Sequence, residues 1–245
     1  METVGIIAGT GFYSLPALDG VQGRTVSTKY GEAFLTAGIW NKVPIEFVTR
    51  HGVDHSVPPS KVNYRANISA LKELGIKKVI AINVVGGIDP TLGAGEVSLV
   101  DDFIDFTSGR EATFFDGIQP GGVEHTDVVD AYDLEIRQAL SASAKEAGIN
   151  LREKGIYAGF NGPRFETPAE IRFAALAGAT VVGMTGCPEV VLAKEAGLRY
   201  ASIALVVNPA AGVSEAKITM DEIRACLAIA STKVIKIIDG AIANI

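Results

Sequence analysis

Short apolar runs alternate with helix-start signals along this chain, and this alternation strongly limits the folds it can adopt. Two of the helix starts are capping boxes, Thr167-Pro168-Ala169-Glu170 and Thr219-Met220-Asp221-Glu222. In a capping box the threonine caps the helix and the glutamate three residues later bonds back to the threonine. Strands that alternate with capped helices favour a sheet covered by helices. We therefore predict one α/β domain over residues 1–245, with a mainly parallel or mixed sheet.

The boundaries of the expected elements follow from where the apolar runs begin and end. The predicted strands are Val4–Ala8, Ala33–Trp40, Val43–Thr49, Lys78–Val85, Gly155–Phe160, Thr180–Met184 and the run from Ala201 to Asn208, with further extended chain over Glu96–Phe106. The predicted helices run from about Ser60 to Gly75, over Leu134–Ala147 and Pro188–Ala196, and onward from each capping box. Residues Phe114–Ala131 are rich in glycine and aspartate and are predicted to form a long surface loop.

Charge and composition exclude several classes of partner. The chain has 22 basic and 28 acidic side chains, a net charge of −6, which argues against general affinity for nucleic acid or an anionic membrane. It has no apolar run of membrane-spanning length and no basic segment at its start, so we expect a cytoplasmic protein. Its two cysteines and three histidines have no metal-ligand spacing, so no metal site is expected.

The apolar run Ala201–Gly212, with the sequence ASIALVVNPAAG, places a polar amide at the mouth of a buried strand. Open α/β sheets bind ligands at such strand ends. The Asn208 side chain offers a donor and an acceptor, which together can read the edge of a heterocycle. The alternative is that Asn208 only forms a turn before Pro209.

Candidate anion-binding residues follow two other strands. The turn Gly9–Gly11 has a serine, Ser14, where a dinucleotide fingerprint needs its third glycine, so dinucleotide binding is not expected. The Thr10 hydroxyl can still bind an anion. Arg50 and His51 follow a strand directly, and a guanidinium fork with an adjacent imidazole matches phosphate oxygens. The alternative for Arg50 is an ordinary ion pair with a carboxylate.

Two further polar side chains lie where a strand turns into a helix. Thr185 comes just before a helix start, where backbone N–H groups favour an anion. Glu166 precedes the capping threonine and can project into a crevice. The alternative is that its negative charge simply interacts favourably with the helix dipole. Cys187 has no evident base and is expected to be buried packing. Anion donors on one side, with an amide and a carboxylate on another, suit a phosphate and a heterocycle bound together.

Five blocks in order resemble the methylthioadenosine phosphorylase branch of the purine nucleoside phosphorylases, and the match covers essentially the whole chain. They are Gly9–Tyr13, Arg50–Gly52, Pro59–Asn67, Gly162–Phe165 and Met184–Glu195. The resemblance implies a three-layer phosphorylase-type fold with a central mixed β-sheet flanked by helices. It also implies a homotrimer that acts on a nucleoside with inorganic phosphate as co-substrate and has no cofactor.

The same resemblance assigns expected roles to individual residues. The phosphate-binding set would be Thr10, Arg50, His51, Asn83, Val84 and Thr185, with the Asn83-Val84 contribution coming from a backbone turn. Met184 would pack on the ribose, Phe165 on the base, and Met220 and Ile223 on the 5′-substituent. His125 would reach the active site of the neighbouring subunit.

The chain departs from the adenine-cleaving members of that family at Asn208-Pro209-Ala210, where they carry Asp-Tyr-Asp. An amide donates to a 6-oxo group and accepts from protonated N7, and Glu166 matches the carboxylate that accepts N1–H in 6-oxopurine phosphorylases. Both positions favour hypoxanthine or guanine over adenine, since an unmatched buried polar pair costs a few kcal/mol. An apolar 5′-pocket favours a methylthio group over a hydroxyl.

The sequence thus predicts a pentosyltransferase of purine salvage, with Asn208, Glu166 and His51 as catalytic residues. The expected reaction is reversible phosphorolysis of S-methyl-5′-thioinosine to hypoxanthine and 5-methylthioribose 1-phosphate. The alternatives are an inosine or guanosine phosphorylase and a methylthioadenosine phosphorylase with relaxed base specificity. Two further alternatives are a nucleoside hydrolase and a purine-sensing module without enzymatic activity.

Overall fold

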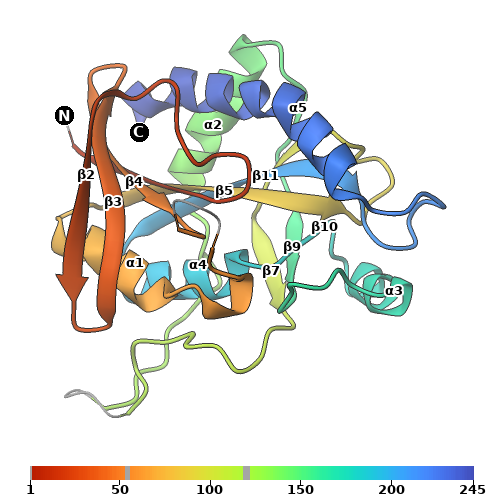
Figure 1. Ribbon diagram of the computed structural model, residues 1–245, viewed down its shortest axis with the longest axis horizontal. Helices are drawn as coiled ribbons and strands as arrows, with labels where there is room; N and C mark the ends of the chain where they lie inside the picture. The colour runs from red at the N-terminus through yellow and green to blue at the C-terminus, as the bar shows by residue number, and fades with distance from the viewer. Residues whose placement is uncertain (1, 53–55, 118–121) are drawn as a thin grey trace.

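A computed structural model describes residues 2–52, 56–117 and 122–245. In these residues eleven strands form one mixed sheet, with α2 and α5 over one face and α1 and α4 over the other (Figure 1). The strands are β1 (Val4–Ala8), β2 (Asp19–Thr28), β3 (Gly31–Trp40), β4 (Val43–Thr49), β5 (Lys78–Gly87), β6 (Val97–Leu99), β7 (Asp102–Asp105), β8 (Leu151–Arg152), β9 (Ile156–Gly159), β10 (Val181–Gly183) and β11 (Arg199–Pro209). The predicted mixed sheet flanked by helices is confirmed.

The helices begin and end close to the positions that the sequence indicates. They are α1 (Tyr64–Glu73), α2 (Leu134–Glu146), α3 (Pro168–Leu176), α4 (Gly186–Glu195) and α5 (Met220–Ala241), with short 3-10 turns at Pro59–Lys61 and Ile242–Asn244. The capping box at Thr167 is confirmed in both directions. At Thr219 the side chain caps α5 by accepting the backbone N–H of Glu222.

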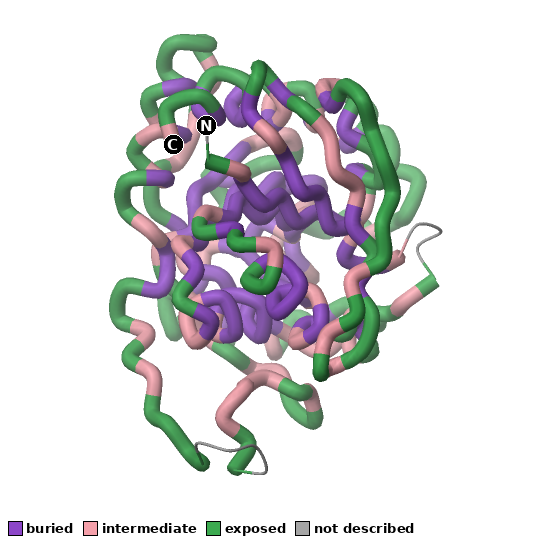
Figure 2. Tube along the Cα trace, turned by 90° about the vertical axis from the view of Figure 1, so that its left-hand side faces the viewer, coloured by how far each residue is buried: buried purple, intermediate pink, exposed green. Residues whose placement is uncertain are grey.

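Each face of the sheet has its own apolar core, so burial is concentrated at the centre of the molecule (Figure 2). One core packs α2 and α5 against the strands, and Leu140 and Ile237 are fully buried in it. The other packs α1 and α4 against the opposite face, and Leu71 and Leu192 are fully buried there. Packing on both sides makes the central strands apolar along their whole length, as the sequence shows.

Three sequence expectations about the elements need correction. Strand β2 was not predicted, because its residues are mostly exposed and polar and it pairs only with β3 at the edge of the sheet. The last strand, β11, does not stop at Asn208: it continues to Pro209, with a bulge between Val206 and Asn208. Helix α4 begins at Gly186, two residues before the predicted Pro188, since proline is tolerated in a first helical turn.

The predicted surface loop is confirmed in its described parts. Residues 114–117 and 122–131 form no helix or strand and lead away from the sheet at the bottom of Figure 1. Among the described residues, no helix has the length and apolar character needed to cross a membrane.

Candidate active site

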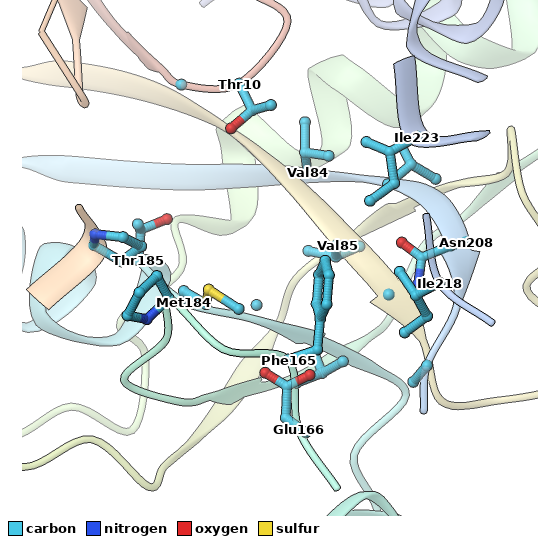
Figure 3. A pocket seen from close by; sticks show the side chains of 18 of the residues that line it. Thr10, Val84, Val85, Phe165, Glu166, Met184, Thr185, Asn208, Ile218 and Ile223 are labelled. Atoms are coloured by element: carbon cyan, nitrogen blue, oxygen red, sulfur yellow. The ribbon is translucent and has the colours of Figure 1, made fainter. Parts of the chain in front are cut away.

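A gap in the central sheet borders the cavity that holds most of the predicted site residues. Strand β5 pairs with β1 over residues 78–81 and with β10 only at Gly86 and Gly87. Along the stretch between these pairings, β5 keeps β11 on its other side, but no described strand fills this edge. The cavity lies at this gap, lined by the end of β1, by Ile82–Gly86 of β5, by β10 and by Asn208 of β11 (Figure 3). Such a switch in strand order is where open α/β sheets bind ligands.

The predicted phosphate residues Thr10, Arg50, His51 and Thr185 all line this cavity, although they come from segments far apart in the sequence. Thr10 follows β1, Arg50 and His51 follow β4, and Thr185 precedes α4. The parallel pairing of β1 with β4 ends together at Ala8 and Thr49, which brings the first three residues side by side. The structure therefore assembles the predicted donors at one end of the cavity.

Arg50 is held by a buried ion pair, as the alternative interpretation of this residue predicts, and its role toward an anion stays a prediction. Its Nε and Nη2 atoms donate to the two carboxylate oxygens of Glu189, each at 2.7 Å. Its Nη1 atom donates to the carbonyl of Ile82 at 3.1 Å, in the stretch of β5 beside which no described strand pairs. Burial opposes the charge of Arg50, but the adjacent Glu189 carboxylate outweighs it and raises the Arg50 pKa. Two of the five guanidinium N–H groups remain beyond these bonds within the described residues.

The bond between His51 and the carbonyl of Val57 determines the tautomer of this imidazole. The Nδ1 atom lies 2.9 Å from the Val57 oxygen, and a carbonyl can only accept, so Nδ1 carries the hydrogen. The ring packs so close to the turn after β1 that a Cβ on Gly9 would lie 2.8 Å from His51 Cδ2. Glycine at position 9 is therefore required for the imidazole to lie in the cavity wall.

A buried hydrogen-bond network fixes Thr185, and it corrects two sequence expectations. The backbone N–H groups of Thr185 and Gly186 both donate to the Tyr157 hydroxyl at 3.1 Å, so these helix-start amides are not available for an anion. The Thr185 hydroxyl donates to Asn83 Oδ1 at 3.1 Å, and Asn83 Nδ2 donates to Ser202 at 2.8 Å. Asn83 lies inside β5 rather than in a turn, and its side chain supports Thr185 from behind the cavity wall. Val84 does line the cavity.

We expect Tyr157→Phe to destabilise the protein by about 1–3 kcal/mol, because two buried N–H groups lose their acceptor. The same change should raise the KM for phosphate more than the KM for nucleoside, since Thr185 loses its support. Urea unfolding and steady-state kinetics measure the two effects. Tyr30→Phe is the matched control, because Tyr30 lies in the turn between β2 and β3 and does not line the cavity. Equal changes in both KM values would contradict the assignment.

The predicted base-reading residues Asn208 and Glu166 both belong to the lining of this cavity. In Figure 3 the Phe165 ring lies between Asn208 and Glu166. Both Asn208 and Glu166 line the cavity together with Ala210. The bulge in β11 reorients the chain at Asn208, and its Nδ2 donates to the Pro209 carbonyl at 2.7 Å. One amide N–H and the Oδ1 atom of Asn208 therefore remain for a ligand.

Glu166 is a buried carboxylate without a full set of partners. Its side chain lies in a residue only 8% exposed, and Oε1 is buried without a hydrogen-bond partner among the described residues. Burial raises the pKa of Glu166, and the negative charge of Glu170 raises it further. The backbone N–H of Glu166 and the positive charge of Arg164 act in the opposite direction, and the net shift is upward. A buried acceptor of this kind is satisfied by a donor from solvent or from a ligand in the cavity.

Close packing holds Met184 in the cavity wall. A Cβ on Gly162 would lie 2.3 Å from Met184 Sδ, and Gly162 also has a positive φ of 58°. The backbone of this region is held by Arg110, which donates to the carbonyls of Met184 at 2.7 Å and Asn161 at 2.8 Å. Arg110 was not singled out from the sequence, because its partners are main-chain atoms that leave no pattern.

The remaining predicted residues divide into two groups. Ile223 is buried in the cavity wall, and Met220 lines the cavity but is 46% exposed. Ile218 and Val207 complete this apolar end. Pro209 and His125 do not line the cavity of their own chain, and His125 lies exposed in the segment 122–131.

Known proteins resemble this chain over its full length. A family model described as the phosphorylase superfamily matches residues 3–243. A 6-oxopurine nucleoside phosphorylase from Pyrococcus furiosus is 42% identical over 99% of this chain and 92% of that protein. A probable S-methyl-5′-thioinosine phosphorylase from Pseudomonas syringae pv. tomato is 44% identical over 93% of each chain. Methylthioadenosine phosphorylase from Schistosoma mansoni, solved in complex with adenine, has a TM-score of 0.93 at 33% identity and covers 100% of this chain and 91% of its own.

Proposed function

The chain belongs to the phosphorylase superfamily and is a pentosyltransferase of the purine nucleoside phosphorylase type, and we propose that its preferred substrate is S-methyl-5′-thioinosine. The products would be hypoxanthine and 5-methylthioribose 1-phosphate. The observation that carries this proposal is the buried, unpartnered Oε1 of Glu166 in the same cavity as the Asn208 amide. A 6-oxopurine brings an N1–H donor to that oxygen, whereas adenine has no hydrogen at N1.

The apolar end of the cavity supports a methylthio group at the 5′-position. Val207, Ile218 and Ile223 line it with alkyl side chains, and Met220 adds a thioether. A 5′-hydroxyl placed against these groups loses its hydrogen bonds to water without replacement. A methylthio group instead gains apolar and sulfur contacts there.

Catalysis in this proposal rests on positioning and electrostatics. Arg50, His51, Thr10 and Thr185 hold the phosphate against the sugar as the glycosidic bond lengthens and the sugar becomes cationic. Asn208 and Glu166 stabilise the departing base as negative charge develops on it. No covalent enzyme intermediate, metal or organic cofactor takes part. The assembly is a cytoplasmic homotrimer in which His125 contributes to the neighbouring active site.

A base-release assay with three nucleosides, each with and without phosphate, tests the proposal. We expect methylthioinosine to have the highest kcat/KM, with inosine and methylthioadenosine well below it and no turnover without phosphate. Inosine as the best substrate would instead identify a general 6-oxopurine phosphorylase. Turnover without phosphate would identify a hydrolase, and binding without product would identify a sensor.

We expect Ile223→Thr to lower kcat/KM for methylthioinosine by about tenfold while leaving that for inosine nearly unchanged. The change replaces a buried alkyl group by a hydroxyl, and small differences in an apolar pocket are worth roughly 10–200-fold. Ile229→Thr is the matched control, because Ile229 lies on the same helix but is 76% exposed. Equal losses for both nucleosides would place the 5′-substituent elsewhere.

A further inference from the structure

We propose that this cavity also accepts 6-aminopurine nucleosides, and that it does so by taking up one proton between the Glu166 carboxyl group and N1 of the base. The inference rests on the proposed function, since it assumes that Glu166 faces N1. It adds a second substrate class whose binding depends on pH, while binding of the 6-oxopurine class does not depend on this proton.

The chemistry follows from the single unpartnered oxygen. Glu166 Oε1 is buried without a donor among the described residues, so a base that lies against it pairs with it either by supplying the hydrogen or by accepting one that the carboxyl group carries. A 6-oxopurine supplies N1–H to the carboxylate. A 6-aminopurine presents a lone pair at N1, and two acceptors would then face each other in a buried site. One added proton, on the carboxyl oxygen or on N1, turns this repulsion into a hydrogen bond.

The charges around Glu166 allow this protonation. Arg164 lies on the same loop, but both its Nη atoms donate to Glu170, at 2.9 and 2.7 Å, so its charge is largely neutralised there. Glu170, on the first turn of α3, is negative and disfavours ionisation of Glu166. At the far end of the cavity, Arg50 is paired with Glu189. Burial raises the pKa of Glu166, so the carboxyl group takes up a proton in less acidic solution than an exposed glutamate does.

The other groups in the cavity do not produce the same pH dependence. The Asn208 amide does not titrate, so any preference that it contributes is constant with pH. His51 lies among the phosphate donors and meets both nucleoside classes alike. The ratio of the two association constants therefore cancels the effect of His51 and isolates the proton shared between Glu166 and the base.

Calorimetric titration in phosphate-free buffer tests the proposal without turnover. Methylthioadenosine and methylthioinosine are titrated into the full-length protein between pH 5 and 8. We expect their ratio of association constants to fall about tenfold per pH unit above the Glu166 pKa. Repeating the neutral titration in two buffers of different ionisation enthalpy should show about one proton taken up with methylthioadenosine and about none with methylthioinosine.

Glu166→Gln is the decisive variant. Its carboxamide can donate to N1 of a 6-aminopurine or accept from a 6-oxopurine without any change of protonation. The ratio of the two association constants should then be nearly constant with pH. Any remaining pH dependence would come from protonation of N1 in the nucleoside itself. Glu146→Gln, an exposed change on α2, should behave as the unaltered protein does.

The possible results distinguish a failure of this inference from a failure of the proposed function. A flat ratio in the unaltered protein, or the same slope in Glu166→Gln, would overturn the inference alone. Failure of both nucleosides to bind at any pH would instead overturn the proposed function. Should the variant not fold, the proton uptake of the unaltered protein still decides the question.

Discussion

Glu189→Gln should destabilise the protein by about 3–5 kcal/mol and greatly weaken its use of phosphate. The change leaves the Arg50 guanidinium buried without its counter-charge, and their side chains are only 2% and 1% exposed. Tyr200 also loses the charged acceptor that its hydroxyl contacts at 2.8 Å. Urea unfolding measures the stability, and phosphate KM measures the positioning of Arg50. Asp221→Asn is the control, because Asp221 pairs with Arg224 at the surface and should show no measurable change.

A double variant separates the structural role of this pair from its role toward phosphate. Arg50→Met with Glu189→Leu removes both charges together, and buried ion pairs replaced by apolar groups often lose little stability. We expect most of the stability lost in Glu189→Gln to return while phosphorolysis stays abolished. Recovery of activity in the double variant would show that Arg50 does not bind phosphate.

Asn208→Asp should shift the ratio of kcat/KM for methylthioadenosine over methylthioinosine by about 100-fold or more toward the 6-amino substrate. An aspartate loses the amide N–H, so a 6-oxo group then meets an acceptor, and a protonated aspartate can donate to N7 of adenine. One or two such buried mismatches cost roughly 1–3 kcal/mol each. Initial rates with both nucleosides at saturating phosphate give the ratio.

Asn244→Asp provides the comparison for this change, because it makes the same chemical replacement at an exposed position beyond α5. Its ratio should equal that of the unaltered protein. If Asn208→Asp also leaves the ratio unchanged, Asn208 does not read the base, and Glu166 alone must account for the preference.

The sequence predicts the central strands well because their burial on both faces makes them continuously apolar. Strand β5 is such a run, and its predicted range, Lys78–Val85, ends two residues before the observed end at Gly87. Strand β2 escapes prediction because only one edge of it pairs and its side chains face solvent. The local sequence pattern therefore predicts the buried central strands of the sheet better than its exposed edge strands.

Only part of the candidate site can be predicted from the sequence. Polar residues that follow strands, such as Arg50 and Asn208, can be recognised from their position. Their supporting partners cannot, because these are joined by the fold: Glu189 lies 139 positions from Arg50, and Ser202 lies 119 positions from Asn83. Tyr157 reads as an ordinary aromatic residue of a buried strand, and only the structure shows its hydroxyl beneath two helix-start amides.

The gap beside the middle of β5, where no described strand pairs, also bears on how substrate preference can change in such a protein. One side of the gap, built by β1, β4 and α4, carries the residues that we propose bind phosphate, while the other side, built by β11 and the loop after β9, carries Asn208 and Glu166. Hydrogen bonds also link the two sides: Arg110 donates to the carbonyls of Met184 and Asn161, and the Tyr157 hydroxyl of β9 accepts the first N–H groups of α4. Under the proposed function, substitutions at Asn208 or Glu166 would change the choice of nucleobase, whereas the residues proposed to hold phosphate lie on other elements.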